Sequence, residues 1–216
     1  MCTSPTFLLL SFAGFLTTLC LFVPFNFLHS FIDKEREEFG LTEEEAATTK
    51  AYLMAVIGIC NTIGRVICGW MSDYPKVDAV MVNNIGCFIG GVATCLVPHI
   101  GSVPVLYVYG VVFGFSFAVF ASLRSVLIIK LMGRENLTKA FGLVCLIQGI
   151  AVVFGSPIAG GIADATHSFT TTFYVFGAIY TVSAIMCIPI RKINRWEKAR
   201  NEKQQDKCSQ LENDNY

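Results

Sequence analysis

The sequence is poor in charge, and the charge that it has lies mostly between long apolar runs. Charged residues make up 15% of the 216 residues, whereas an ordinary soluble domain carries roughly 25%. The 16 basic and 16 acidic side chains cancel, so no overall field favours nucleic acid as a partner. Hydrophobic residues make up 54%, in runs too long for one globular core. The composition excludes an ordinary soluble domain and predicts an integral membrane protein.

The apolar runs also lack the residues of a membrane-embedded hydrolase or a metal site. Such an enzyme needs an intramembrane acid pair, or a serine with a histidine. No Asp, Glu or His lies deep in a run, because His29, His99 and His167 all stand at run ends. The nine cysteines show no C-x-x-C or Cys/His metal spacing and fall mainly within the runs, so we expect reduced packing cysteines. We expect no enzyme, no metal and no cofactor.

Six runs are long enough to cross a bilayer, since a spanning helix needs about 20 predominantly apolar residues. No Lys or Arg precedes the first run, and it is longer than the apolar part of a signal peptide, so we interpret it as a permanent span. We expect an all-α membrane protein, with a six-helix bundle in residues 1–190 and a disordered, basic and polar cytoplasmic tail in residues 191–216. The predicted spans are approximately residues 7–27, 47–71, 80–97, 103–129, 140–163 and 172–190.

Lysine and arginine are distributed unequally between the two sides of these spans, and this bias sets the orientation of a membrane protein. One side carries only Lys34, Arg36 and Lys50. The bias predicts that both termini are cytoplasmic, with the basic tail as an anchor near anionic lipid. An interaction segment is the alternative role for that tail. The other side carries Lys76, Lys130, Arg134, Lys139, Arg191, Lys192, Arg195, Lys198, Arg200, Lys203 and Lys207.

The loop from Ser30 to Thr48 is rich in acidic residues. We interpret it as a solvated linker and helix start, with a cation-attracting vestibule as the alternative. Thr42 followed by Glu45 fits a capping box, in which each side chain satisfies a backbone donor of the other residue. We therefore expect the second helix to begin outside the bilayer.

Two arginines remain inside spans, Arg65 in the second and Arg124 in the fourth. An arginine near a helix centre costs about 2.5–3.5 kcal/mol on insertion scales, so such residues usually face a cavity on a substrate or ion pathway. Arg65 shares a helical face with Asn61, and Arg124 shares one with Phe117. For both arginines the alternative is a side chain that extends to the membrane surface, and this is easier for Arg124, which lies farther from its helix centre. Phe117 is a candidate wall of the cavity, or a packing residue.

Glycine and proline recur within the spans. Gly86 with Gly90, and Gly110 with Gly114, form G-x-x-x-G patterns, which favour close helix packing. Gly155-Ser156-Pro157 is expected to interrupt the fifth span, a feature common where transporters bend or bind their substrates.

Several longer runs resemble one known family. The most specific run ends in Ala140-Phe141-Gly142 and is followed by Gln148-Gly149 and by Gly155 with Pro157. These runs are similar to the C-terminal half of a monocarboxylate transporter of the major facilitator superfamily, from residue 5 to about residue 190. Further matching runs are Gly58-Ile59-Cys60-Asn61-Thr62-Ile63-Gly64-Arg65, Gly69-Trp70-Met71-Ser72-Asp73, Ser122-Leu123-Arg124-Ser125-Val126 and Asp164-Ala165-Thr166.

The resemblance implies a parent architecture of twelve spans in two six-helix halves, with this chain matching spans seven to twelve. It implies a substrate path between the halves, alternating access, and a plasma-membrane carrier of small monocarboxylates or related organic anions. The arginine matching Arg65 receives the carboxylate in relatives that carry lactate or pyruvate with a proton. In those relatives an acid stands at the position of Asn61, and an amide cannot titrate, so proton coupling through this helix is not implied here.

The expected substrate-binding residues are therefore Arg65, Asn61, Phe117 and Arg124. A second group, Gly69, Asp73, Gly155, Pro157 and Asp164, is assigned to gate or structural motifs, with Asp73 at a helix end. The expected partners are the organic anion, a proton or another coupling ion as a candidate, the lipid bilayer, and a missing N-terminal half or a second copy. The alternative function is a truncated, non-transporting membrane protein that pairs with another six-helix half or a full-length relative.

Overall fold

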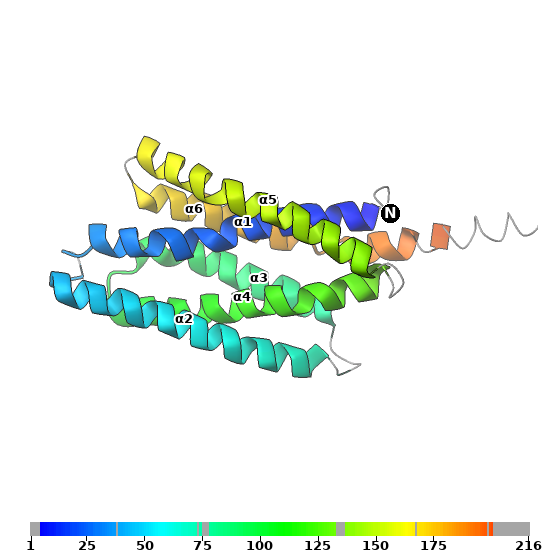
Figure 1. Ribbon diagram of the computed structural model, residues 1–216, viewed down its shortest axis with the longest axis horizontal. Coiled ribbons are helices and arrows are strands. Elements are labelled where there is room, and N and C mark those ends of the chain that lie inside the picture. The colour runs from blue at the N-terminus through cyan, green and yellow to red at the C-terminus, as the bar shows by residue number, and fades with distance from the viewer. Residues whose placement is uncertain are drawn as a thin grey trace, which may run out of the picture.

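The chain folds into six long α-helices in the computed structural model, which describes residues 5–37, 39–72, 74, 78–132, 137–166, 168–197 and 199–200 (Figure 1). All six are long and apolar enough to cross a membrane, which confirms the predicted fold class. The helices are α1 (Pro5–Lys34), α2 (Glu43–Ser72), α3 (Ala79–Leu96), α4 (Val103–Met132), α5 (Leu137–Thr166) and α6 (Phe169–Met186), with a short 3-10 turn, η1 (Val97–His99), after α3.

The predicted capping box starts α2. The Thr42 backbone N–H donates to Glu45 Oε2 at 2.9 Å, and the Glu45 N–H donates to Thr42 Oγ1 at 3.4 Å. These bonds satisfy backbone donors that have no partner within the helix. As a result α2 begins at Glu43, before the predicted apolar span, and Lys50 forms an ion pair with Asp33 of α1 across the intervening loop.

The helices lie side by side along the long axis of the molecule (Figure 1). α2 packs on α4, α3 lies against both α4 and α6, and α1 lies against α5 and α6. Glycines permit the closest approaches: a Cβ at Gly114 would lie 2.8 Å from the Ile57 carbonyl oxygen of α2, and one at Gly86 would lie 2.8 Å from the Val119 side chain of α4. The G-x-x-x-G patterns therefore lie where α4 meets α2 and α3, as small residues do in membrane helix packing.

Buried hydroxyl groups connect the helices as well. Ser183 of α6 donates to the Ala13 carbonyl of α1 at 2.7 Å and lies 2.7 Å from Thr17 Oγ1. Ser116 of α4 donates to the Gly86 carbonyl of α3 at 2.7 Å and lies 3.0 Å from the hydroxyl of Tyr180 on α6. Hydrogen bonds of this kind contribute about 0.6 kcal/mol each on average between membrane helices. They fix which faces of α1, α3, α4 and α6 point inward.

α2 and α5 are the least covered helices. Only 22% of the most apolar window of α2 and 17% of that of α5 are buried, against 61% for α1. Their open faces carry large apolar side chains such as Ile59 and Val66 on α2 and Leu146 and Val153 on α5. Each of these two helices therefore leaves an apolar face open.

Two regions differ from the sequence-based expectation: the helix around Pro157 and the chain that follows α6. Pro157 does not interrupt the fifth span, because α5 runs without a break through it. α6 ends at Met186, and a turn precedes Ile190 because Pro189 has no N–H to continue the helical bonding. Residues 191–197 and 199–200 of the expected disordered tail are helical, and residues 201–216 lie outside the described part of the chain.

Candidate functional site

A cavity of about 300 Å³ lies between α1, α4 and α5. Its volume is at the lower end of the range for small-molecule pockets, about 300–1,000 Å³. Its walls are mainly aromatic, from Phe22, Phe117, Phe120 and Phe141. The polar lining groups are Thr18 of α1, Arg124 of α4 and Gln148 of α5. Two of the four predicted binding residues, Phe117 and Arg124, therefore line one cavity.

Arg124 is buried, with 7% of its surface exposed. Its guanidinium lies over the Phe120 ring, with Cζ 4.8 Å from the centroid. With the Gln148 amide oriented so that its oxygen faces Arg124, that oxygen accepts from Nη2 at 2.7 Å, from Nε at 3.1 Å and from Thr18 Oγ1 at 3.3 Å. Arg124 is therefore buried within the bundle instead of extending to its surface, because Gln148 of α5 supplies a hydrogen-bond partner there.

Gly14 of α1 makes room for this guanidinium. A Cβ at Gly14 would overlap the Arg124 Nη2, Cζ and Nη1 atoms. Gly155 of α5 allows a second close approach, because a Cβ there would lie 2.9 Å from the Leu19 carbonyl oxygen of α1. Two glycines thus set how closely α1 approaches Arg124 and α5.

Arg65 has a different environment on the open face of α2, where its side chain is exposed. Its Nε donates to Asn61 Oδ1 at 2.9 Å, and Asn61 Nδ2 donates to the Gly114 carbonyl of α4 at 3.4 Å. Asn61 was expected to offer donors to an anion. Instead its oxygen holds Arg65 while its nitrogen attaches to α4, so it positions Arg65.

Phe117 connects the two arginines. The Arg65 Cζ atom lies 5.9 Å from its ring centroid, within the range of a cation–π contact. The same ring lines the cavity of Arg124 and packs edge-on against Phe22 and Phe25 of α1, with centroids 6.4 and 5.6 Å apart. Phe117 therefore contacts Arg65 directly and shares the lining of one cavity with Arg124.

The residues assigned to gate or structural motifs lie elsewhere. Gly69 is near the end of α2 with open space where a Cβ would be, and Pro157 and Asp164 are exposed on α5. Only Gly155 makes a close helix contact among those that the structure describes, and Asp73 lies outside the described residues. None of these described residues lines the Arg124 cavity.

Gln148 and Thr18 are site residues that sequence reasoning missed. Gln148 is the one amide of the fifth predicted span, and a polar side chain at that depth is expensive enough to indicate a role. Thr18 gives no comparable signal, because isolated threonines are common in membrane helices. Its role becomes evident only when α1 is placed against α5.

The chemistry of this arrangement would suit an anionic ligand. Neither arginine forms an ion pair with a carboxylate among the described residues; their partners are neutral amides and aromatic rings. A guanidinium carries five N–H donors and pairs with a carboxylate through two parallel bonds. Gln148 occupies two donor groups of Arg124, so donor capacity remains for an anionic ligand.

Six helices long and apolar enough to cross a membrane define a multi-span membrane protein, and three of them line a cavity that contains the buried Arg124. The profile of the Major Facilitator Superfamily matches residues 10–213, and the chain belongs to that family, whose members are transporters and not enzymes. The family match thus agrees with the resemblance at the level of the superfamily.

Relatives within this family are distant. The chain is similar to monocarboxylate transporter 3 of Rattus norvegicus, 24% identical over 85% of this chain and 36% of that protein. It is also similar to monocarboxylate transporter 12 of Homo sapiens, 25% identical over 74% of this chain and 31% of that protein. Monocarboxylate transporter 14 of Mus musculus is 32% identical over 63% of this chain and 26% of that protein. The chain thus spans about a third of the length of the curated relatives that it matches.

Proposed function

We propose that this chain is the C-terminal half of a plasma-membrane carrier that moves small monocarboxylates or similar organic anions by alternating access. The observation that carries the proposal is Arg124, a buried guanidinium without a carboxylate partner among the described residues, which faces a cavity of suitable size. Burying a charge without a counter-charge is costly. An anionic substrate supplies the counter-charge, and the relief of this free-energy cost contributes to the affinity of the substrate.

The cavity wall favours a substrate with an apolar body. Four phenylalanines enclose the space beside Arg124, while polar groups on the wall are few. A carboxylate on Arg124 would leave the remainder of the substrate against Phe117 and Phe120. We infer a preference for a single anionic group attached to an apolar or aromatic body, such as benzoate, over a dicarboxylate.

Arg65 is assigned to the same transport path but to a more open position. Its exposure on α2, and its contact with the far side of Phe117, suit a residue that meets the anion before or after the cavity. Because Asn61 cannot titrate, a proton is not expected to be taken up at this pair.

The open apolar faces of α2 and α5 support the two-half arrangement. An apolar helix face alone would suit lipid, but the open face of α2 also carries Arg65, and an arginine that faces lipid is costly, so this face is proposed to meet a partner. The partner is proposed to be an N-terminal six-helix half or a second copy. The alternative function, a non-transporting membrane protein that pairs with another half, uses the same surface.

The test separates binding from transport. The purified chain in lipid nanodiscs is titrated with radiolabelled benzoate, lactate and succinate, and proteoliposomes are prepared with the chain alone or with the first six spans of a monocarboxylate transporter relative. The proposal expects benzoate and lactate to bind more tightly than succinate. It expects uptake only when the chain is paired with the six spans of the relative or with a second copy of itself. Absence of anion binding at millimolar concentrations would contradict the anion site. Binding without uptake in any combination would favour the non-transporting alternative.

A further inference from the structure

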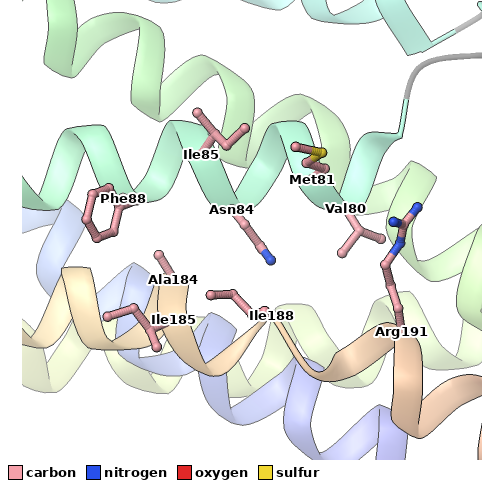
Figure 2. Close-up of a pocket in the computed structure, with 9 residues that line it drawn as sticks. All are labelled: Val80, Met81, Asn84, Ile85, Phe88, Ala184, Ile185, Ile188 and Arg191. Atoms are coloured by element: carbon pink, nitrogen blue, oxygen red, sulfur yellow. The ribbon is translucent and has the colours of Figure 1, made fainter.

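A second cavity, separate from the arginine site, lies between α3 and α6. It is an open groove of about 400 Å³, and Figure 2 shows its lining residues facing one another from the two helices. Its wall is almost entirely apolar, and several wall residues are strongly exposed: 64% for Ile188 and 58% for Met81. The groove is therefore an apolar depression that is open to the surroundings of the bundle.

One end of the groove is basic. Arg191 closes the end nearest Val80, whereas Phe88 and Ile185 lie at the other end (Figure 2). The next basic residues along the chain, Lys192 and Arg195, are exposed. The groove thus combines a long apolar wall with one cationic terminus.

Asp78 lies at this basic end of the groove and contributes to the charge there. Its carboxylate forms an ion pair with Arg191, and its Oδ1 atom accepts from the Val80 N–H at 3.1 Å as the N-cap of α3. Asp78 neutralises some of the charge of Arg191. A guanidinium has five donors, however, so Arg191 retains N–H groups for another anion.

Asn84 supplies a polar group inside the groove. Its side chain reaches from α3 toward α6 (Figure 2), and its Oδ1 atom is buried without a hydrogen-bond partner among the described residues. An unpaired buried acceptor costs about 1–3 kcal/mol. The amide nitrogen is the end that points into the groove (Figure 2), where it can donate to an ester or phosphate oxygen of a ligand.

We propose that the α3–α6 groove is a binding site for one anionic phospholipid, with an acyl chain against Ile85, Ile185 and Ile188 and the phosphate at Arg191. The charge distribution selects this occupant: the apolar wall suits a hydrocarbon chain, the basic terminus suits a phosphate, and Asn84 lies between them where a glycerol ester oxygen would be. The segment from Val80 to Phe88 spans about 12 Å of helix, which is close to the thickness of one hydrocarbon leaflet, about 15 Å.

The predicted membrane orientation, with both termini cytoplasmic, also favours an anionic lipid. It places Arg191, in the helical segment that follows α6, on the cytoplasmic side, where anionic lipids are concentrated and basic pockets between helices bind their head groups. The site is independent of the anion cavity, which is formed by α1, α4 and α5. Lipid binding can therefore be tested without knowledge of the transported substrate.

The experiment titrates the delipidated chain in detergent with dioleoylphosphatidylserine or dioleoylphosphatidylcholine and counts bound lipids by native mass spectrometry. The wild-type chain is expected to retain one phosphatidylserine more tightly than phosphatidylcholine. Arg191→Gln should weaken phosphatidylserine binding about fivefold, the contribution of one basic residue near a membrane surface. Lys192→Gln is the matched control, since it removes the same charge one residue away from the groove wall, and it should change the affinity less than about twofold.

A gain-of-function variant covers the case in which Arg191→Gln fails to fold. Asp78→Asn keeps an N-cap side chain, because asparagine caps helices as well as aspartate does, and frees the guanidinium. It should strengthen phosphatidylserine binding severalfold and leave phosphatidylcholine unchanged. Ile188→Trp, which fills the groove, should weaken both lipids.

Three results would overturn the proposal. Equal losses in Arg191→Gln and Lys192→Gln would show only a diffuse attraction to the basic tail. Equal binding of the two lipids by the wild-type chain would remove the head-group preference. A dimer in lipid-free detergent that Ile188→Trp dissociates would assign the groove to a second copy of the chain.

Discussion

The two intramembrane arginines have the same chemistry and opposite surroundings. Arg124 is buried and has neighbours from three helices: Gly14 and Thr18 on α1, Phe120 on its own helix, and Gln148 on α5. Arg65 is exposed, bonded to the amide of Asn61 one turn earlier and stacked on Phe117. The first is fixed by tertiary packing and the second mainly by its own helix.

This difference assigns different roles to the two residues within one path. A guanidinium held in place loses little conformational freedom when an anion arrives, so its bonds contribute fully to affinity. An exposed guanidinium on an open face meets the anion first but must become ordered to hold it. We therefore expect Arg124 to dominate affinity and Arg65 to influence entry and release.

The largest expected effect is that of Arg124→Gln on anion binding. Hydrogen bonds to a charged group contribute about 1.5–3 kcal/mol, so benzoate affinity should fall about 10- to 150-fold. Stability should stay constant or increase, because the variant removes a buried charge that lacks a counter-charge. Benzoate titration and thermal unfolding of the same samples measure the two quantities.

Lys139→Gln serves as the control, since it removes one positive charge from an exposed site on α5. An Arg124→Gln chain that binds benzoate like the control would contradict the assigned role. A chain that loses stability together with binding would indicate that Arg124 mainly holds α1 and α5 together.

The second prediction concerns the space that α1 leaves for Arg124. Gly14→Ala should destabilise the bundle by about 1–3 kcal/mol, the usual cost of overpacking, because the new methyl group overlaps the guanidinium. Gly58→Ala on the open face of α2 adds the same methyl group where no atom lies within 4 Å, and alanine favours helix. Thermal unfolding in detergent compares them. Equal melting temperatures would mean that Arg124 can shift without cost.

The sequence predicted the features of the fold that depend on local pattern. Apolar run length located six spans, and Thr42 with Glu45 located the start of α2. Boundaries were less accurate where polar residues extend a helix beyond the bilayer, as at the end of α1, and where Pro189 introduces a turn. These features depend on the few residues around each helix end.

The environment of Arg124 was not predictable in the same way. Its position in the fourth span is compatible with a side chain that extends to the membrane surface and with one that is buried. Which of these occurs depends on the residues of the neighbouring helices that pack against it. Gly14 and Gln148 are distant from Arg124 in sequence, and only the packing of α1 and α5 places them beside it. Pattern along one helix identifies a polar face, whereas the partner of that face is a property of the tertiary structure.

The third prediction tests the positioning role of Asn61. Asn61→Asp gives Arg65 a carboxylate partner that competes with an incoming anion. Benzoate affinity should therefore be lower at neutral pH and should rise about tenfold on acidification as the new carboxylate is protonated and releases Arg65. The wild-type chain should change less than about twofold over the pH range in which benzoate stays ionised.

Asn61→Ala provides the comparison, since it removes the bond to Arg65 without adding a titratable group. It should lower affinity slightly at every pH. If Asn61→Asp also gave a flat profile, Arg65 would have no role in anion binding, and the exposed arginine would be separated from the path that Arg124 lines.

The smallest expected effect tests whether the Phe117 ring helps Arg65 to bind the anion. Phe117→Leu keeps an apolar wall but removes the ring face under Arg65, and a cation–π contact contributes about 0.5–1 kcal/mol at an exposed site, so benzoate affinity should fall about two- to fivefold. A double-mutant cycle with Arg65→Gln should then be non-additive, because Arg65 lies over that ring. A cycle with Arg124→Gln should be nearly additive, since the guanidinium of Arg124 lies over Phe120 instead. Additivity in both cycles would mean that Phe117 acts on neither arginine during anion binding, and coupling of Phe117 to Arg124 alone would confine the site to the buried cavity.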